Sequence, residues 1–436
     1  MVAREATGRP ARIHNRANGY SHRVSPDVPA LVARTVAIEE PQDLLALLPV
    51  DAPVSWVRRG EGLVGWGTST VLRTSGATRF ADAAKWWTEV VASAQVTDQV
   101  EEPGTGLVSF GSFAFADTPG DSVLTVPAMI VGRRGRRAWL TTITADDPAD
   151  AERPALTPAE APPAPRDVVF SDGALDGETW MAVVAEAVRR IGHGDLEKVV
   201  LARDLVATAA EDIDVRWPLT QLASSYPMCW TFHVDGLFGA TPELLVRRER
   251  GLVTSRVLAG TIQRTGDDAH DLALAATLAR SSKDLEEHEY AVRSVADALE
   301  PHCSSMNVPE APFVLHLPNV MHLATDVAGV ARDDRTSLEL AQALHPSAAV
   351  GGTPRPEALA VIEELEGMDR DRYAGPVGWM DASGDGEWGI ALRSALLAGS
   401  IVRLFAGCGV VGSSVPASEL AESQAKLVPV RDALGS

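Results

Sequence analysis

The stretch LLVRRERGLVTSRVLAGT, residues 244–261, has the pattern of two strands joined by a turn. Apolar and β-branched residues fill both arms, and the RERG in the middle ends in a glycine, a residue that tight turns favour. The stretch before it, WTFHVDGLFGAT at residues 230–241, is also typical of strands. Strands that follow one another through hairpins pair antiparallel. We therefore expect an α+β fold with large, mostly antiparallel sheets packed as a sandwich and helices outside.

Helices and further strands are expected on both sides of these hairpins. Helical spacing of apolar residues runs from Asp176 to Gly192, with the glycine closing the helix, and a last helix should begin with Ser418 as its N-cap. The run EKVVLARDLVATA, residues 197–209, is typical of a buried strand. Other expected helices lie near residues 80–94, 268–301, 337–344 and 356–366, and other strands near 322–330 and 376–412.

Two segments look unlike the rest of the chain. Residues 1–26 carry five arginines and one glutamate without an apolar core of signal-peptide length, and we interpret them as a disordered basic tail. Residues 146–167 are rich in proline and alanine, which disfavours a helix or a central strand. They divide residues 27–436 into an N-terminal half, 27–167, and a C-terminal half whose motifs span 177–432.

Composition excludes several functions. The 436 residues carry a net charge of −20, which repels nucleic acid and anionic membranes, so an anionic ligand needs a locally positive site. The three cysteines are far apart and favour neither a disulfide framework nor a zinc site, which fits a reducing cytoplasm. Residues 394–412 are long enough to cross a bilayer, but four glycines and a central Arg403 predict a buried hairpin instead.

Two helices carry acidic pairs at helical spacing. In SSKDLEEHEY, residues 281–290, Asp284 and Glu287 share one face beside an apolar stripe. In SELAESQAKL, residues 418–427, Glu419, Glu422 and Lys426 share a face. Solvated acidic surfaces, or acids that favour a helix dipole, would explain each pair alone. Two carboxylates with water and an anionic substrate are also the ligands that Mg²⁺ accepts.

Lys198 and Glu243 are two further candidates. Lys198 lies in an expected strand, where a charge marks either a sheet edge or a functional site. Burial would disfavour its ammonium form and make it a base near neutral pH. Glu243 follows a Thr-Pro turn and could be an ordinary turn acid. Pattern alone leaves both alternatives open.

The order and spacing of nine motifs resemble the chorismate-utilising enzymes, and among them the isochorismate synthases. The resemblance covers about residues 177–432; the N-terminal half matches only in length and strand-rich texture. It implies one large domain over residues 27–436 despite the linker-like segment. The motifs are EKVVLAR, FGATPELL, LAGT, KDLEEHEYAV, LHPSAAVGGTPR, YAGPVGW, GEWGIALRSA, FAGCGVV and ELAESQAKL.

The resemblance also implies roles for single residues. Glu287 and Glu422 would bind Mg²⁺, with Asp284 and Glu419 as nearby acids, and the metal would hold the ring carboxylate of chorismate. Lys198 would take a proton from water as it attacks C2, and Glu243 would protonate the departing 4-hydroxyl. Residues implied to hold carboxylates or to line the ring are Gly260, Thr261, His345, Ala349, Tyr373, Arg393, Gly407, Gly409 and Lys426.

Single residues separate the branches of this family. Lys198, and Ala259 where aminodeoxychorismate synthases carry a lysine, point to water as the nucleophile, so no amidotransferase subunit is expected. Ala349 favours the isochorismate-forming branch over salicylate synthase, which goes on to eliminate pyruvate and remains the alternative. A binding protein without catalysis should lack Lys198, Glu243 or a metal-binding glutamate, yet all are present. We expect a monomer; which pathway would use the product stays open.

Overall fold

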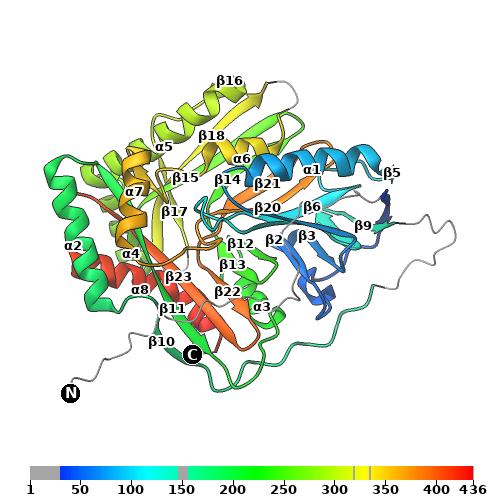
Figure 1. Ribbon diagram of the computed structural model, residues 1–436, viewed down its shortest axis with the longest axis horizontal. Coiled ribbons are helices and arrows are strands. Elements are labelled where there is room, and N and C mark those ends of the chain that lie inside the picture. The colour runs from blue at the N-terminus through cyan, green and yellow to red at the C-terminus, as the bar shows by residue number, and fades with distance from the viewer. Residues whose placement is uncertain (1–29, 146–155, 318–319, 333–334, 436) are drawn as a thin grey trace, which may run out of the picture.

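Two large β-sheets dominate the computed structural model, which describes residues 30–145, 156–317, 320–332 and 335–435, with the side chains of Lys283 and Glu287 excepted (Figure 1). Neighbouring strands pair antiparallel in both sheets except for β1 and β5. The expected α+β class with mostly antiparallel sheets is confirmed. Helices cover the outer faces, as the coiled ribbons around the sheets in Figure 1 show.

The first sheet has thirteen strands within the described residues. A short strand, β19 (Gly352–Thr353), pairs with β11 outside the main order. In spatial order the others are β10 (Val169–Asp172), β11 (Lys198–Thr208), β23 (Ile401–Val410), β22 (Ser394–Ala398), β13 (Leu237–Thr241), β12 (Trp230–Val234), β2 (Val54–Arg58), β3 (Glu61–Trp66), β8 (Met129–Arg134), β9 (Arg137–Thr144), β1 (Val32–Ile38) and β5 (Gln95–Asp98).

The second sheet has ten strands within the same residues. Its β17 (Phe313–His316) pairs with β18 outside the main order. In spatial order the others are β16 (Cys303–Asn307), β18 (Val320–Ala331), β15 (Leu252–Gln263), β14 (Leu244–Glu249), β21 (Gly386–Ile390), β20 (Pro376–Asp381), β6 (Val108–Ser112), β7 (Ser122–Val126) and β4 (Thr70–Thr74).

Both sheets contain strands from both halves of the chain. In the first sheet the halves meet where β2 pairs with β12, and in the second where β6 pairs with β20. In Figure 1 the blue and cyan strands of the N-terminal half therefore continue the sheets of the later, green to red strands. The segment at 146–155, part of the linker-like stretch, lies outside the described residues.

Eight α-helices are described. Helix α8 packs against β23 and α2, and helix α5 packs against β15 and β18. These two helices carry the acidic pairs of the sequence. The bounds are α1 (Arg79–Ser93), α2 (Gly177–His193), α3 (Arg216–Ser225), α4 (Asp268–Leu278), α5 (Ser282–Leu299), α6 (Ser337–Leu344), α7 (Arg355–Leu365) and α8 (Pro416–Ala433), with short 3₁₀ turns at Leu45–Leu47 and Glu300–His302.

The main core lies between the two sheets. Trp56 and Phe232 of the first sheet and Phe110 and Trp388 of the second are almost fully buried in one apolar cluster. A second cluster lies under α3 and α8 and includes Leu219 of α3. Burying large aromatic side chains on the inner faces of both sheets supplies the main driving force for packing them together.

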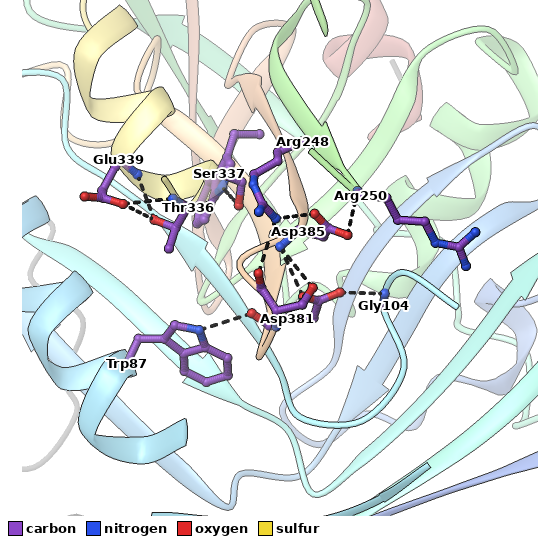
Figure 2. A network of polar contacts seen from close by, with 11 residues as sticks. Trp87, Gly104, Arg248, Arg250, Thr336, Ser337, Glu339, Asp381 and Asp385 are labelled. Carbon is purple, nitrogen blue, oxygen red and sulfur yellow. Dashed lines mark hydrogen bonds and ion pairs between the residues drawn. The ribbon is translucent and has the colours of Figure 1, made fainter. Parts of the chain in front are cut away.

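A polar network also connects the halves (Figure 2). The Asp381 carboxylate accepts a hydrogen bond from the Gly104 amide at 3.1 Å, and the Asp381 carbonyl accepts one from Trp87 Nε1 at 3.3 Å. Asp385, in the same β20–β21 turn, accepts a bond from the Arg250 amide at 2.9 Å. Because Asp381 and Asp385 are buried, these bonds satisfy groups that would otherwise be costly to desolvate.

Most expected elements lie where the sequence predicted them, with two corrections at helix ends. Helix α2 continues past Gly192 and ends at Gly194, whose φ of 87° gives the left-handed cap. Helix α8 begins after Val415 with proline at its first position, so Ser418 lies inside it and is not the N-cap. Residues 394–412 form mainly β22 and β23, and no helix of the described chain is both long and apolar enough to cross a membrane.

Candidate active site

A cavity of about 170 Å³ lies between β11, β23, the bulge of β15, and helices α5 and α8. Segments separated by more than 200 residues converge here. The residues on its wall that the sequence singled out are Lys198, Glu243, Gly260, Thr261, Asp284, Ala349, Tyr373, Arg393, Gly407, Gly409, Glu419, Glu422 and Lys426.

Lys198 is the first residue of β11 and is only 4% exposed. Its backbone pairs with Thr353 of β19, so it does not lie on an open sheet edge. Val200, which strand alternation places on the same face, lines the cavity too. Of the two alternatives for this lysine, the structure favours a site over an edge charge.

Glu243 lies between β13 and β14 and is 5% exposed. Burial raises the pKa of its carboxyl to about 8, and the positive charges of Arg393 and Lys198 offset only part of that rise. A carboxyl with this pKa is largely protonated at neutral pH and can donate a proton. A turn acid in solvent would not have this property.

Arg393 and Tyr373 form a cationic, hydrogen-bonding part of the wall. Arg393 has a φ of 49°, a left-handed conformation that non-glycine residues rarely adopt and that is often found at functional sites. Tyr373 is buried and stacks on Phe405 with ring centroids 5.1 Å apart, and burial raises its pKa, which keeps the hydroxyl protonated. A Cβ on Gly407 would lie 3.3 Å from the Tyr373 hydroxyl, so glycine gives this hydroxyl room.

The bulge in β15 brings the opposite wall close to helix α5. The strand register shifts between Ala259 and Thr261, and Gly260 has a φ of 77°. A Cβ there would lie 3.1 Å from the Cβ of Asp284. Glycine therefore permits both the bulge and the close approach of the α5 acid.

His322 was not predicted from the sequence, yet it lines the cavity beside Thr261. It is 5% exposed, and its Nδ1 lies 3.0 Å from the Thr261 hydroxyl. Burial, Arg393 and Lys426 lower its pKa to about 3, so the ring is neutral. Nε2 is buried without a hydrogen-bond partner among the described residues. Such an atom is available to a ligand in the cavity.

Helix α8 places two carboxylates and an amine on the cavity wall. Lys426 Nζ lies 2.6 Å from the Glu422 carboxylate and donates to the Gly407 carbonyl at 2.9 Å. Burial lowers the pKa of the Lys426 amine, but the nearby negative charge of Glu422 outweighs this effect. The pKa therefore lies above its usual range, and the amine stays protonated. Glu419, one turn before Glu422, is 7% exposed.

The donor set on α8 fits a hard divalent cation. Ligand atoms of Glu419, Glu422 and Cys408 lie within 4.8 Å of one another. The Cys408 thiol donates to the Glu419 carbonyl at 3.2 Å, and burial raises its pKa, so it offers no thiolate. The two carboxylates remain as oxygen ligands, which suits Mg²⁺. Asp284 lines the same cavity from α5.

Two residues that the sequence predicted for the site are not among the described residues on the cavity wall. The side chain of Glu287 lies outside the described residues, although its backbone belongs to α5. His345 is not on the cavity wall: it lines a separate cavity of about 560 Å³, and its Nε2 donates to the Phe115 carbonyl at 2.9 Å. Two N-terminal rings, Phe80 and Phe115, pack around its imidazole, so the structure does not bring His345 to the wall of this cavity.

Known proteins resemble this chain over most of its length. The pattern of the family described as chorismate binding enzyme matches residues 53–435. The isochorismate synthase MenF of Bacillus subtilis is 31% identical over 401 residues, which cover 86% of this chain and 85% of that protein.

Solved structures resemble it as well. The structure of DhbC from Bacillus anthracis covers 90% of this chain and 98% of its own, with a TM-score of 0.74 and 32% identity. That of MenF, the menaquinone-specific isochorismate synthase from Escherichia coli, is 24% identical, covers 94% of this chain and 96% of its own, and has a TM-score of 0.75.

Proposed function

The chain belongs to the chorismate-binding enzyme family, and from the chemistry of its cavity we propose that it converts chorismate to isochorismate. In this reaction water adds at C2, the ring double bonds shift, and the 4-hydroxyl departs. The relative from Bacillus subtilis is named as an isochorismate synthase, which supports the same reaction here.

One observation carries the proposal: a buried lysine and a buried glutamic acid, whose pKa burial raises to about 8, line the same cavity. Lys198 would accept the proton that water loses when its oxygen bonds to C2. Glu243 would donate a proton to the 4-hydroxyl, which leaves as water. Addition and departure occur at different ring carbons, so the reaction needs a base and an acid at separate positions.

The productive protonation state pairs a neutral amine with a neutral acid. This state has the same total number of protons as a Lys198 ammonium beside a Glu243 carboxylate, so the two states differ only in which residue holds the proton. Burial of Glu243 favours the productive distribution because it disfavours the carboxylate.

Three groups on the wall suit the carboxylates of chorismate. The Arg393 guanidinium can grip a carboxylate through two hydrogen bonds, and the Lys426 ammonium and the Tyr373 hydroxyl can each donate one. The orphan Nε2 of His322 can take part in a further hydrogen bond with the substrate. These groups give a net anionic protein a locally positive place for a dianion.

Mg²⁺ belongs to the proposal as the cofactor. Glu422 of α8 and Glu287 of α5 would hold it, with Glu419 and Asp284 as nearby acids on the same two helices. The bound cation would supply positive charge against the ring carboxylate of the substrate. Because water is the proposed nucleophile, no amidotransferase subunit is needed.

The test combines product identification with isotope labelling. Purified protein is incubated with chorismate and Mg²⁺ in H₂¹⁸O, and the products are separated by chromatography and identified by mass spectrometry. Isochorismate with one heavy oxygen at C2 is expected. Pyruvate release in step with chorismate loss would instead show salicylate formation, and the absence of any turnover would reject the catalytic proposal.

A further inference from the structure

The edge of β11 that faces away from β23 is only partly covered by strands. Near its start, β19 pairs with Lys198 and Val199, and near its end β10 pairs with residues 205–208. Between them, residues 200–204 have no strand partner on this edge within the described chain. Buried backbone groups need hydrogen bonds from other sources.

Side chains supply three of those bonds. Arg370 Nη2 donates to the Val200 carbonyl at 2.7 Å, and Glu366 Oε1 accepts from the Ala202 amide at 2.7 Å. Trp180 Nε1 of α2 donates to the Ala202 carbonyl at 3.1 Å. Three side chains thus replace the missing piece of strand.

Arg370 and Glu366 act as one unit. Their side chains are 2% and 1% exposed, and Arg370 Nε donates to Glu366 Oε2 at 2.8 Å. The guanidinium also lies over the Phe115 ring, with its Cζ 4.1 Å from the ring centroid. A buried charge pair with this many hydrogen bonds has little freedom to move.

The same guanidinium holds the loop that pairs with β11. Arg370 Nη1 donates to the Val350 carbonyl at 2.9 Å. The next residues of that loop reach the strand: Gly351 accepts from the Val200 amide at 2.8 Å, and Thr353 accepts from the Glu197 amide at 2.8 Å. One side chain therefore fixes β11 and its short partner strand together, next to Lys198.

We propose that Arg370, held by Glu366, is the positioning residue that sets Lys198 in the cavity. The inference rests on the proposed function in so far as Lys198 is the base. A planar guanidinium with five N–H groups can bridge two carbonyls and a carboxylate, whereas a lysine ammonium cannot match that geometry. Displacing the start of β11 would move the amine relative to C2 of the substrate.

The test compares Arg370→Lys with Trp180→Phe. Both remove hydrogen bonds from the same strand edge, but only the first acts next to Lys198. For Arg370→Lys we expect kcat to fall about ten- to a hundredfold with little change in KM, since small misplacements of a reacting group have effects of this size. Trp180→Phe should lower the melting temperature and leave kcat per folded molecule nearly unchanged.

A second readout follows Lys198 without catalysis. The reactivity of its amine is measured from pH 6 to 11 by brief acetylation and mass spectrometry of the Lys198 peptide. We expect the pH profile of Lys198 acetylation to change in Arg370→Lys, and in Trp180→Phe to match that of the protein without substitutions. A changed profile with an unchanged kcat would support the positioning role and reject Lys198 as the base.

An Arg370→Lys protein that only melts earlier, with kcat and the acetylation profile both unchanged, would overturn the proposal. If that variant folds poorly, the double variant Arg370→Gln, Glu366→Gln takes its place, because it leaves no lone charge buried. The same fall in kcat and the same change in profile are expected of it, and their absence would count equally against the proposal.

Discussion

Replacing Glu243 with glutamine should stabilise the protein, and more so as the pH rises. The pKa of this carboxyl is about 8 in the folded protein, against an ordinary value of 4.5. Between these values the folded chain binds the proton that the unfolded chain has released. Stability of the unmodified protein therefore falls as the pH rises through this window.

The magnitude follows from the two pKa values. Because Glu243 loses its proton more readily in the unfolded chain than in the folded one, it costs the native state about 2 kcal/mol of stability at pH 6 and about 5 kcal/mol at pH 9. Glutamine has nearly the same shape and does not ionise. The stability gained by Glu243→Gln should thus grow by about 3 kcal/mol between pH 6 and pH 9.

Guanidinium unfolding followed by tryptophan fluorescence measures the difference at each pH. Glu286→Gln serves as the control, since it removes one negative charge from an exposed position of the same net anionic chain. Activity should fall about 10²- to 10⁴-fold in Glu243→Gln because the acid is lost. A stability gain that is the same at pH 6 and pH 9 would refute the idea that Glu243 is protonated in the folded protein.

Three further predictions concern the same cavity. Lys198→Ala should lower kcat about 10²- to 10⁴-fold while Mg²⁺ still raises the melting temperature; undiminished turnover would exclude this lysine as the base. Mg²⁺ at a hundredfold excess over its Kd should stabilise the protein by about 3 kcal/mol; Glu422→Gln should lose this gain and Cys408→Ala should keep it. Scanning calorimetry of both variants with and without Mg²⁺ measures the gain, and the reverse pattern would make the thiol a ligand. Gly260→Ala should lower the free energy of unfolding by about 1–2 kcal/mol because the backbone there is left-handed, and it should weaken Mg²⁺ binding because the new methyl group contacts Asp284. Chemical unfolding with and without Mg²⁺ measures both effects, and unchanged values would mean that the bulge adapts freely.

Local patterns predicted the strands and helices well because hairpin and helix signals are contained in a few neighbouring residues. The expected helical region from 268 to 301 is in fact two helices, α4 and α5, and Ser281 caps the second by accepting from the Asp284 amide. Gly192 and Gly194 look equivalent in the sequence IGHG. Only the backbone bonds from Gly194 to the last turn decide which of them ends α2.

Side-chain positions in the site were less predictable where distant segments decide them. The direction of His345 depends on rings more than 200 residues earlier in the chain. His322 gains its place through Thr261, a partner on another strand, and Arg370 through Val200, 170 residues away. No short-range pattern contains these contacts. Helical spacing and strand position singled out the acids and the lysine as candidates, and the resemblance of their motifs to a known family favoured a functional role over a structural one.

The way each sheet is shared between the two halves has a consequence for synthesis. When the first 145 residues have left the ribosome, β2 and β6 each have one open edge, and the strand that completes the second of these, β20, begins only at Pro376. Unpaired edges on a nascent chain invite contact with other chains, and pairing over such separations is slow. We expect a chaperone that shields those edges to raise the yield of native protein far more than one that acts after release.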